Sequence, residues 1–147
     1  MLEKFLSTDQ SFILTVARVC LGLVMIPHGL QKIAGLFGGY GWAATIKYFS
    51  SLGFPVAITV LVMAAESLGA LGLLAGFCTR FCAFAIGLTM LGAAIFVRAN
   101  GFFMNWTGQQ AGEGFEYHIL AITLAFILTV AGGGAFSADG YIADSMK

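Results

Sequence analysis

The feature that most constrains the fold is a set of four apolar stretches, each long enough to cross a lipid bilayer. A spanning α-helix needs about 20 largely apolar residues, and the stretches run at about residues 11–33, 56–77, 81–97 and 114–135. They lack strict alternation and exceed the roughly 10 residues of a membrane β-barrel strand. The sequence therefore predicts an all-α, multi-pass integral membrane four-helix bundle, with a single membrane domain over residues 1–147 and both termini on the same side.

Composition supports a membrane protein and excludes nucleic-acid partners. Only 10% of the residues are charged, against about 25% in an ordinary soluble domain, so the lipid bilayer is the expected surrounding. The formal net charge is zero, and such a chain offers no basic surface to nucleic acid. Basic residues divide three to three between the two sides and leave the orientation open. The first stretch carries Arg18 and no small-x-small cleavage pattern, so we expect it to be retained as a helix.

The connections between the stretches differ in character. A glycine-rich and aromatic segment, residues 35–55, is long enough to hold an interfacial or re-entrant helix around 42–51. Residues 78–80 form only a tight turn. The third connection, residues 99–113, mixes Phe, Trp, Asn and Gln, a composition typical of headgroup depth.

Two charged residues lie within the apolar stretches, Arg18 in the first and Glu66 near the middle of the second. A charge at helix centre costs about 2.5 to 3.5 kcal/mol on insertion scales, so we expect the two side chains to face the bundle interior and to meet. One interpretation is a structural ion pair that fixes helix register. A second is a proton-handling or ligand-contacting carboxylate whose properties Arg18 adjusts, and a third is an unpaired or protonated Glu66.

The first helix carries a polar stripe that is expected to face the other helices. At 100° per residue its members fall within an arc of about 80°, and they are Arg18, Met25, His28, Gly29 and Lys32. Pro27 removes a helix hydrogen bond beside His28 and favours a kink that leaves room for a ligand. His28 is open to three interpretations: a hydrogen-bonded core histidine, a proton relay or quinone-carbonyl contact, or a metal ligand.

A second group of polar residues approaches the membrane side away from the termini. Its members are His28, Lys32, Arg98, Asn100, Asn105, Glu113, Glu116 and His118. We expect Glu116 to point inward, while His118 lies about 200° around the helix and does not share its face. For Lys32, Arg98 and Glu113 the alternative is snorkelling and surface ion pairing at helix ends.

Cofactor motifs are absent from the sequence. Three cysteines occur without a Cys-x-x-Cys motif, and the two histidines lie on different predicted helices, so we expect no metal site. No haem, iron–sulfur, flavin or nucleotide fingerprint is present. The small residues around Gly72-x-x-x-Gly76 favour close helix packing.

The order of several motifs resembles the DoxX family over nearly the whole chain. The motifs are Arg18, HGLQK (28–32), the loop GLFGGYG, LGFP, AESLGALGLLAGFCTR (65–80), NGFFMN, GFEYHIL and the closing GGGAFSADG. Position 98 is arginine where many members have histidine. The resemblance implies a four-helix membrane protein similar to the small subunit of thiosulfate:quinone oxidoreductase, or a membrane partner in a thiol-redox complex.

The resulting hypothesis is a quinone-interacting subunit or membrane anchor of a redox system in the bacterial inner membrane, at most one subunit of an enzyme complex. Its expected catalytic residues are Glu66, His28 and Glu116, and its expected ligand-binding residues are Arg18, Lys32, Arg98 and Asn100. We expect a polar cavity between the first, second and fourth helices, lined by Arg18, His28, Lys32, Glu66 and Glu116. Electrons would come from a partner protein or substrate. A non-enzymatic scaffold, or a module that binds a small solute or lipid, is the alternative. A transporter is disfavoured, because four spans are a small number for that class of protein and no internal repeat relates them. The sequence leaves a homo-oligomer open.

Overall fold

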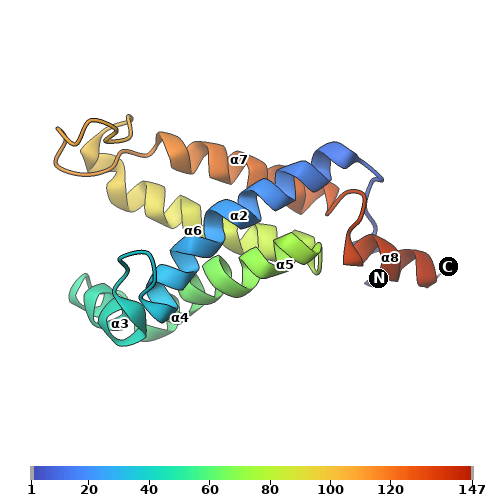
Figure 1. Ribbon diagram of the computed structural model, residues 1–147, viewed down its shortest axis with the longest axis horizontal. Coiled ribbons are helices and arrows are strands. Elements are labelled where there is room, and N and C mark those ends of the chain that lie inside the picture. The colour runs from blue at the N-terminus through green and yellow to red at the C-terminus, as the bar shows by residue number, and fades with distance from the viewer. Residues whose placement is uncertain (1, 147) are drawn as a thin grey trace.

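The computed structural model describes residues 2–146, and within them the regular elements are all helical (Figure 1). Two short helices stand near the ends of the chain, α1 (Leu2–Leu6) and α8 (Ala138–Ser145). The long helices and the interfacial one lie between them: α2 (Phe12–Ala34), α3 (Gly41–Ser51), α4 (Val56–Ala64), α5 (Ala70–Ala75), α6 (Thr79–Val97) and α7 (Glu116–Ala131). A π-helical turn, η1 (Ala65–Gly69), joins α4 to α5, and a 3₁₀ turn, η2 (Arg98–Asn100), ends α6.

The bounds agree with the predicted spans, except that the fourth is shorter than expected. Three segments are long and apolar enough to cross a membrane: Phe12–Ala34, Val56–Ala75 and Thr79–Asn100. The fourth, α7, has 16 residues, or about 24 Å at 1.5 Å per residue. It ends early because Gly132 takes a positive φ of 89° and turns the chain back toward α8.

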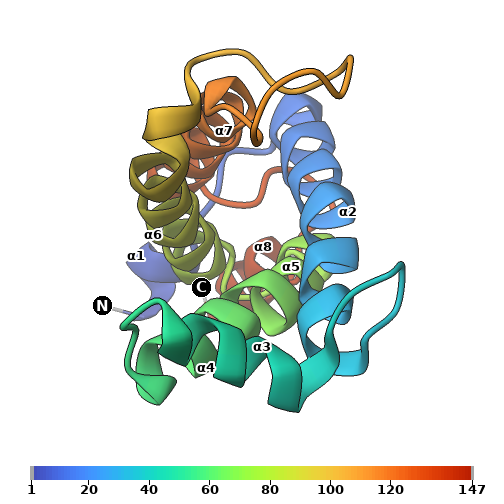
Figure 2. The same cartoon turned by 90° about the vertical axis from the view of Figure 1, so that its left-hand side faces the viewer.

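The helices α2, α5, α6 and α7 are arranged around a common centre (Figure 2), and side chains from all four form one apolar core. Leu21 and Met25 of α2, Leu73 of α5 and Ile86 of α6 are almost fully buried, together with Leu128 of α7. Residues 2–6 and α8 lie together at one end of the bundle, so the two ends of the chain are on the same side (Figure 1). The helix predicted around residues 42–51 is present as α3, which lies at the opposite end of the bundle (Figure 1).

Large apolar side chains cover the outside of the long helices. Ile13, Leu61, Leu68, Leu120 and Phe126 are each between 65% and 79% exposed. Such a surface is disfavoured in water and suited to hydrocarbon. The protein is therefore a membrane protein whose outer helix faces contact the lipid bilayer.

Close packing of α2 on the second span depends on Gly29. A Cβ atom there would lie 2.7 Å from the carbonyl oxygen of Glu66 and 2.8 Å from the Cα of Ser67. The absent side chain lets the two backbones touch where η1 interrupts the α-helix. π-turns inside α-helices are frequent at functional sites.

Candidate functional site

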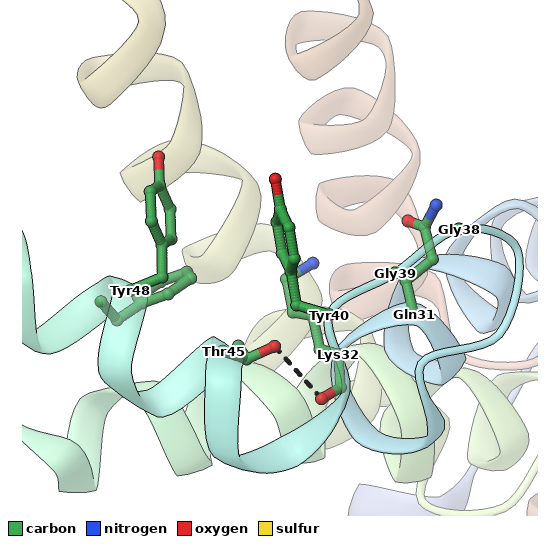
Figure 3. Close-up of a pocket in the computed structure, with 8 residues that line it drawn as sticks. Gln31, Lys32, Gly38, Gly39, Tyr40, Thr45 and Tyr48 are labelled. Atoms are coloured by element: carbon green, nitrogen blue, oxygen red, sulfur yellow. Dashed lines mark hydrogen bonds between the residues drawn. The ribbon is translucent and has the colours of Figure 1, made fainter.

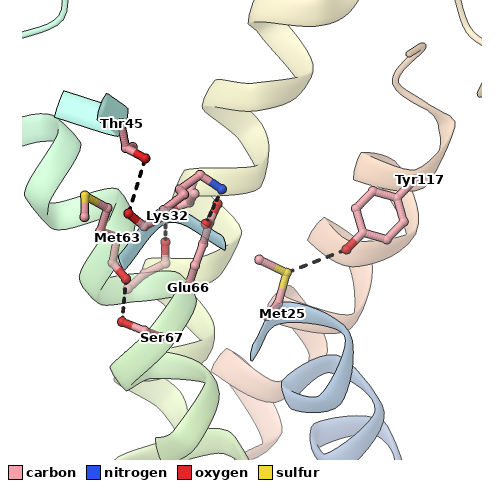
Figure 4. Close-up of polar contacts among 9 residues, drawn as sticks. Met25, Lys32, Thr45, Met63, Glu66, Ser67 and Tyr117 are labelled. Carbon is pink, nitrogen blue, oxygen red and sulfur yellow. Dashed lines mark hydrogen bonds and ion pairs between the residues drawn. The ribbon is translucent and has the colours of Figure 1, made fainter. Parts of the chain in front are cut away.

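The Lys32 ammonium and the Glu66 carboxylate form an ion pair inside the bundle. Lys32 Nζ lies 2.5 Å from Glu66 Oε2, and the two side chains are 23% and 5% exposed. Figure 4 shows the pair at the crossing of α2 with the second span. Lys32 belongs to the last turn of α2, whereas Glu66 lies in η1. The ion pair therefore joins the first span to the π-turn of the second.

Local backbone features fix the orientation of Glu66. The π-turn places Ala65, Glu66, Ser67 and Gly69 in buried positions on successive sides of the helix. Ser67 Oγ donates to the carbonyl of Met63 at 2.6 Å. Buried carboxylates at membrane depth are costly unless they are paired. The fold therefore holds a charged pair at a position where an apolar pair would have a lower free-energy cost of burial.

Aromatic and imidazole side chains of α2 and α7 border the pair. The rings of His28 and Tyr117 have centroids 6.4 Å apart, and Tyr117 and His118 have centroids 5.5 Å apart. The Tyr117 hydroxyl points at Met25 Sδ, 3.6 Å away (Figure 4). His118 Nδ1 is buried without a hydrogen-bond partner among the described residues. The α7 side of the site is therefore lined by groups that can carry protons.

The expected contact between Arg18 and Glu66 is not formed, and Lys32 takes its place. Arg18 is 3% exposed, and its guanidinium donates to backbone carbonyls instead. The acceptors are Leu73 and Leu74 (Nη1, both 2.7 Å), Gly133 (Nε, 2.8 Å) and Phe136 (Nη2, 2.9 Å). The carbonyls at the end of α5 lie about two helical turns nearer the termini than Glu66, so Arg18 reaches them first. A guanidinium so fully bonded has a structural role.

Asp139 completes this cluster at the terminal end. Its carboxylate accepts the backbone N–H groups of Cys78 and Thr79, each at 2.7 Å, at the start of α6. A carboxylate is favourable at the N-terminus of a helix. Asp139 and Arg18 attract each other electrostatically, so the closing GGGAFSADG motif holds α2, α5 and α6 together. Asp139 belongs to the GGGAFSADG motif, but the sequence patterns assigned no role to this residue.

Three of the expected site residues lie around the loop between η2 and α7 and do not join the Lys32–Glu66 pair. They are Arg98, Asn100 and Glu116. Glu116 Oε2 accepts the N–H of Met104 at 3.2 Å, because Glu116 begins α7 and faces the loop that precedes it. Asn100 Nδ2 donates to the carbonyl of Glu113 at 3.0 Å. Arg98 is exposed, with its Nη1 3.4 Å from the carbonyl of Ile95. Of the second polar group, Lys32 therefore joins Glu66 in the buried pair, whereas Glu116, Arg98 and Asn100 make separate contacts around the loop.

A cavity of about 240 Å³ lies beside Lys32, between α2, the 35–40 loop and α3 (Figure 3). We refer to it as the α3 cavity. Its lining consists of Gln31, Lys32, Gly38, Gly39, Tyr40, Thr45, Tyr48 and Phe49. The expected polar cavity was placed between the first, second and fourth spans, whereas the α3 cavity opens on the other side of Lys32. The α3 cavity was not predicted, because the periodicity of a helix does not tell how a neighbouring helix folds back on it.

The arrangement combines the elements that proton-coupled chemistry needs. A buried carboxylate can exchange a proton, an adjacent ammonium can stabilise negative charge on an oxygen, and the Lys32 side chain also lines the α3 cavity. Tyr117, which the sequence patterns did not single out, and His118, which was expected only as a member of the second polar group, are further candidates. Both residues lie in the GFEYHIL motif, of which only Glu116 was expected to be catalytic.

Comparison with known proteins identifies relatives among bacterial membrane proteins. Residues 13–99 match the DoxX family. A Bacillus subtilis (strain 168) protein named "Putative oxidoreductase CatD" is 30% identical over 112 residues, 76% of this chain and 75% of that protein. The Escherichia coli (strain K12) "Inner membrane protein YqjF" is 32% identical over 125 residues, 84% of this chain and 87% of that protein. No solved structure gives a significant match.

Proposed function

The chain belongs to the DoxX family of membrane proteins, and on that premise we propose that it is a quinone-interacting membrane subunit of a redox system. Its quinone would be held next to the Lys32–Glu66 pair. The name of the relative CatD contains the word oxidoreductase, which supports a redox role. The name of YqjF supports placement in the bacterial inner membrane.

The observation that carries the proposal is the buried ion pair itself. Its carboxylate is 5% exposed within a span of otherwise apolar composition. A lysine ammonium has three N–H donors; one reaches Glu66, and another can donate to a carbonyl oxygen of a ligand. Charged residues inside membrane helices mark ligand or proton pathways.

The chemistry assigned to this chain is binding and proton handling. Reduction of a quinone to a quinol consumes two electrons and two protons, and the electrons would come from a reduced partner protein. Glu66 would exchange one proton with the ligand, and Lys32 would stabilise negative charge on the ligand oxygen. His28 and Tyr117 border the pair from α2 and α7 and would pass a proton to Glu66 from that side.

The experiment is mass spectrometry of an organic extract from the detergent-purified protein. We expect about one quinone per chain in the wild type, loss of it in Glu66→Gln, and retention in Glu3→Gln, a control at an exposed carboxylate outside the spans. A quinone level equal to that of an unrelated membrane protein of similar size would overturn the proposal.

A scaffold function is the second candidate, and the Arg18 network favours it. That network joins α2, α5 and the C-terminal segment through hydrogen bonds to backbone carbonyls. Under this hypothesis Glu66→Gln lowers stability alone. The extract experiment separates the two hypotheses when the melting temperature of the same variants is recorded beside it.

A further inference from the structure

The α3 cavity has a preformed floor. Thr45 Oγ1 donates to the carbonyl of Lys32 at 3.2 Å and is almost fully buried. Gln31 Nε2 donates to the carbonyl of Phe37 at 3.1 Å. These two bonds attach α3 and the 35–40 loop to the last turn of α2. A ligand would therefore find the cavity already shaped, which lowers the entropic cost of binding.

Aromatic rings form one wall of the cavity. The rings of Tyr40 and Tyr48 have centroids 6.3 Å apart with an interplanar angle of 30°. Figure 3 shows the two rings side by side with their hydroxyls pointing the same way. Phe49 packs edge-on against Tyr48 at 5.9 Å. Such a wall suits a flat ring, because aromatic faces stack on ring systems.

The charge of the cavity excludes an anionic headgroup as the best ligand. Lys32 is the charged residue of the lining, and its ammonium is already paired with Glu66 at 2.5 Å. A phosphate would bring negative charge close to that carboxylate, with no second cation in the lining to offset it. The remaining polar groups are the tyrosine hydroxyls, the Gln31 amide and the Thr45 hydroxyl. Neutral hydrogen-bonding groups and ring faces together match an uncharged ring that carries carbonyl oxygens.

Lys32 connects the cavity to the buried carboxylate. The same side chain lines the cavity and donates to Glu66. A ligand bound there would lie one side chain away from Glu66, on the side of α2 away from Tyr117. It could enter from the membrane interface without separating the long helices.

We infer that the α3 cavity is the binding site for the head group of the ligand, an uncharged ring with carbonyl oxygens of the benzoquinone class. The ring packs on Tyr40 and Tyr48, and a carbonyl oxygen accepts a hydrogen bond from Lys32. This inference rests on the proposed function and adds the location of the ring. It places the ligand outside the space between α2 and α7.

The test is photolabelling of the purified protein with a short-chain azidobenzoquinone, followed by peptide mapping. We expect the label on residues 35–51. It should fall at least fivefold in the double variant Tyr40→Leu/Tyr48→Leu and persist in Tyr48→Phe, which keeps the ring. Tyr141→Leu is the matched control, because Tyr141 is 80% exposed, close to the 77% of Tyr40, and lies on α8 at the other end.

Three outcomes separate the inference from the proposed function. Label concentrated on residues 116–131 would overturn the cavity assignment and leave quinone binding standing. Label no greater than on an unrelated membrane protein would overturn both. If the double variant fails to fold, the map of the wild type decides between the two positions alone.

Discussion

Lys32 Nζ and Glu66 Oε2 lie 2.5 Å apart at the point where α2 crosses the π-turn of the second span. Three residues earlier on α2, Gly29 lies so close to the backbone of Glu66 that a Cβ atom there would be 2.7 Å from the Glu66 carbonyl oxygen. One turn of α2 therefore sets both the distance between the two helices and the partner of the buried carboxylate. This coupling of packing and charge leads to the predictions below.

The ion pair should appear as an interaction energy in a double-mutant cycle. We expect Lys32→Met and Glu66→Gln to couple by about 1–3 kcal/mol, because each single change leaves a buried polar partner unsatisfied. The measurement is unfolding of the two single variants and the double variant in mixed detergent. Additive effects of the two changes would contradict the pair.

Gly29→Ala should destabilise the protein by about 1–3 kcal/mol, since the added methyl overlaps the backbone of η1. Gly92→Ala is the matched control, also inside a spanning helix, and a Cβ there meets nothing within 4 Å. We expect that change to be neutral or to stabilise by up to about 1 kcal/mol. Thermal unfolding of both variants checks the prediction, and equal melting temperatures would contradict the close crossing.

Arg18→Lys should destabilise the protein by about 2 kcal/mol or more. A single ammonium cannot reach all the carbonyls that the guanidinium bonds, and each buried acceptor left without a donor costs about 1–3 kcal/mol. The folded fraction should retain quinone as the wild type does. Loss of quinone at unchanged stability would instead give Arg18 a role in ligand binding.

Cys78 should react slowly with alkylating reagents. Burial raises the pKa of the Cys78 thiol, and the nearby Asp139 carboxylate raises it further. A raised pKa leaves less thiolate at a given pH, so the rate curve of iodoacetamide labelling shifts to higher pH than in the SDS-denatured chain. The measurement uses the Cys20→Ser/Cys82→Ala background, and adding Asp139→Asn should move the curve back to lower pH. Coincident curves for the folded and denatured chains would contradict the structure.

The fold was predictable because membrane spans follow from length and hydropathy. The first stretch, 11–33, matches α2, and the interfacial segment matches α3. The fourth stretch was overestimated at 114–135, because an apolar glycine run resembles helix in hydropathy. The positive φ of Gly132 ends α7, and the hydropathy of the sequence does not reveal that backbone angle.

The candidate site was predictable only in part, because helical periodicity assigns a residue to a face and not to a partner. The stripe on α2 includes Lys32, which does meet Glu66, whereas the expected partner of that carboxylate was Arg18. Two of the carbonyls that bond Arg18, those of Gly133 and Phe136, belong to the C-terminal loop, whose path helical periodicity does not give. Tyr40 and Tyr48 share a cavity because α3 folds back on α2, which their sequence positions do not reveal.

The most direct test is a binding titration with a short-chain benzoquinone followed by fluorescence of Trp42. The chain has two tryptophans, so Trp106→Phe leaves Trp42 of α3 as the reporter. The account predicts saturable quenching, a Kd at least tenfold weaker in Glu66→Gln, and an unchanged Kd in Glu3→Gln. The same Kd in all three proteins, or quenching that never saturates, would contradict a ligand site at the Lys32–Glu66 pair.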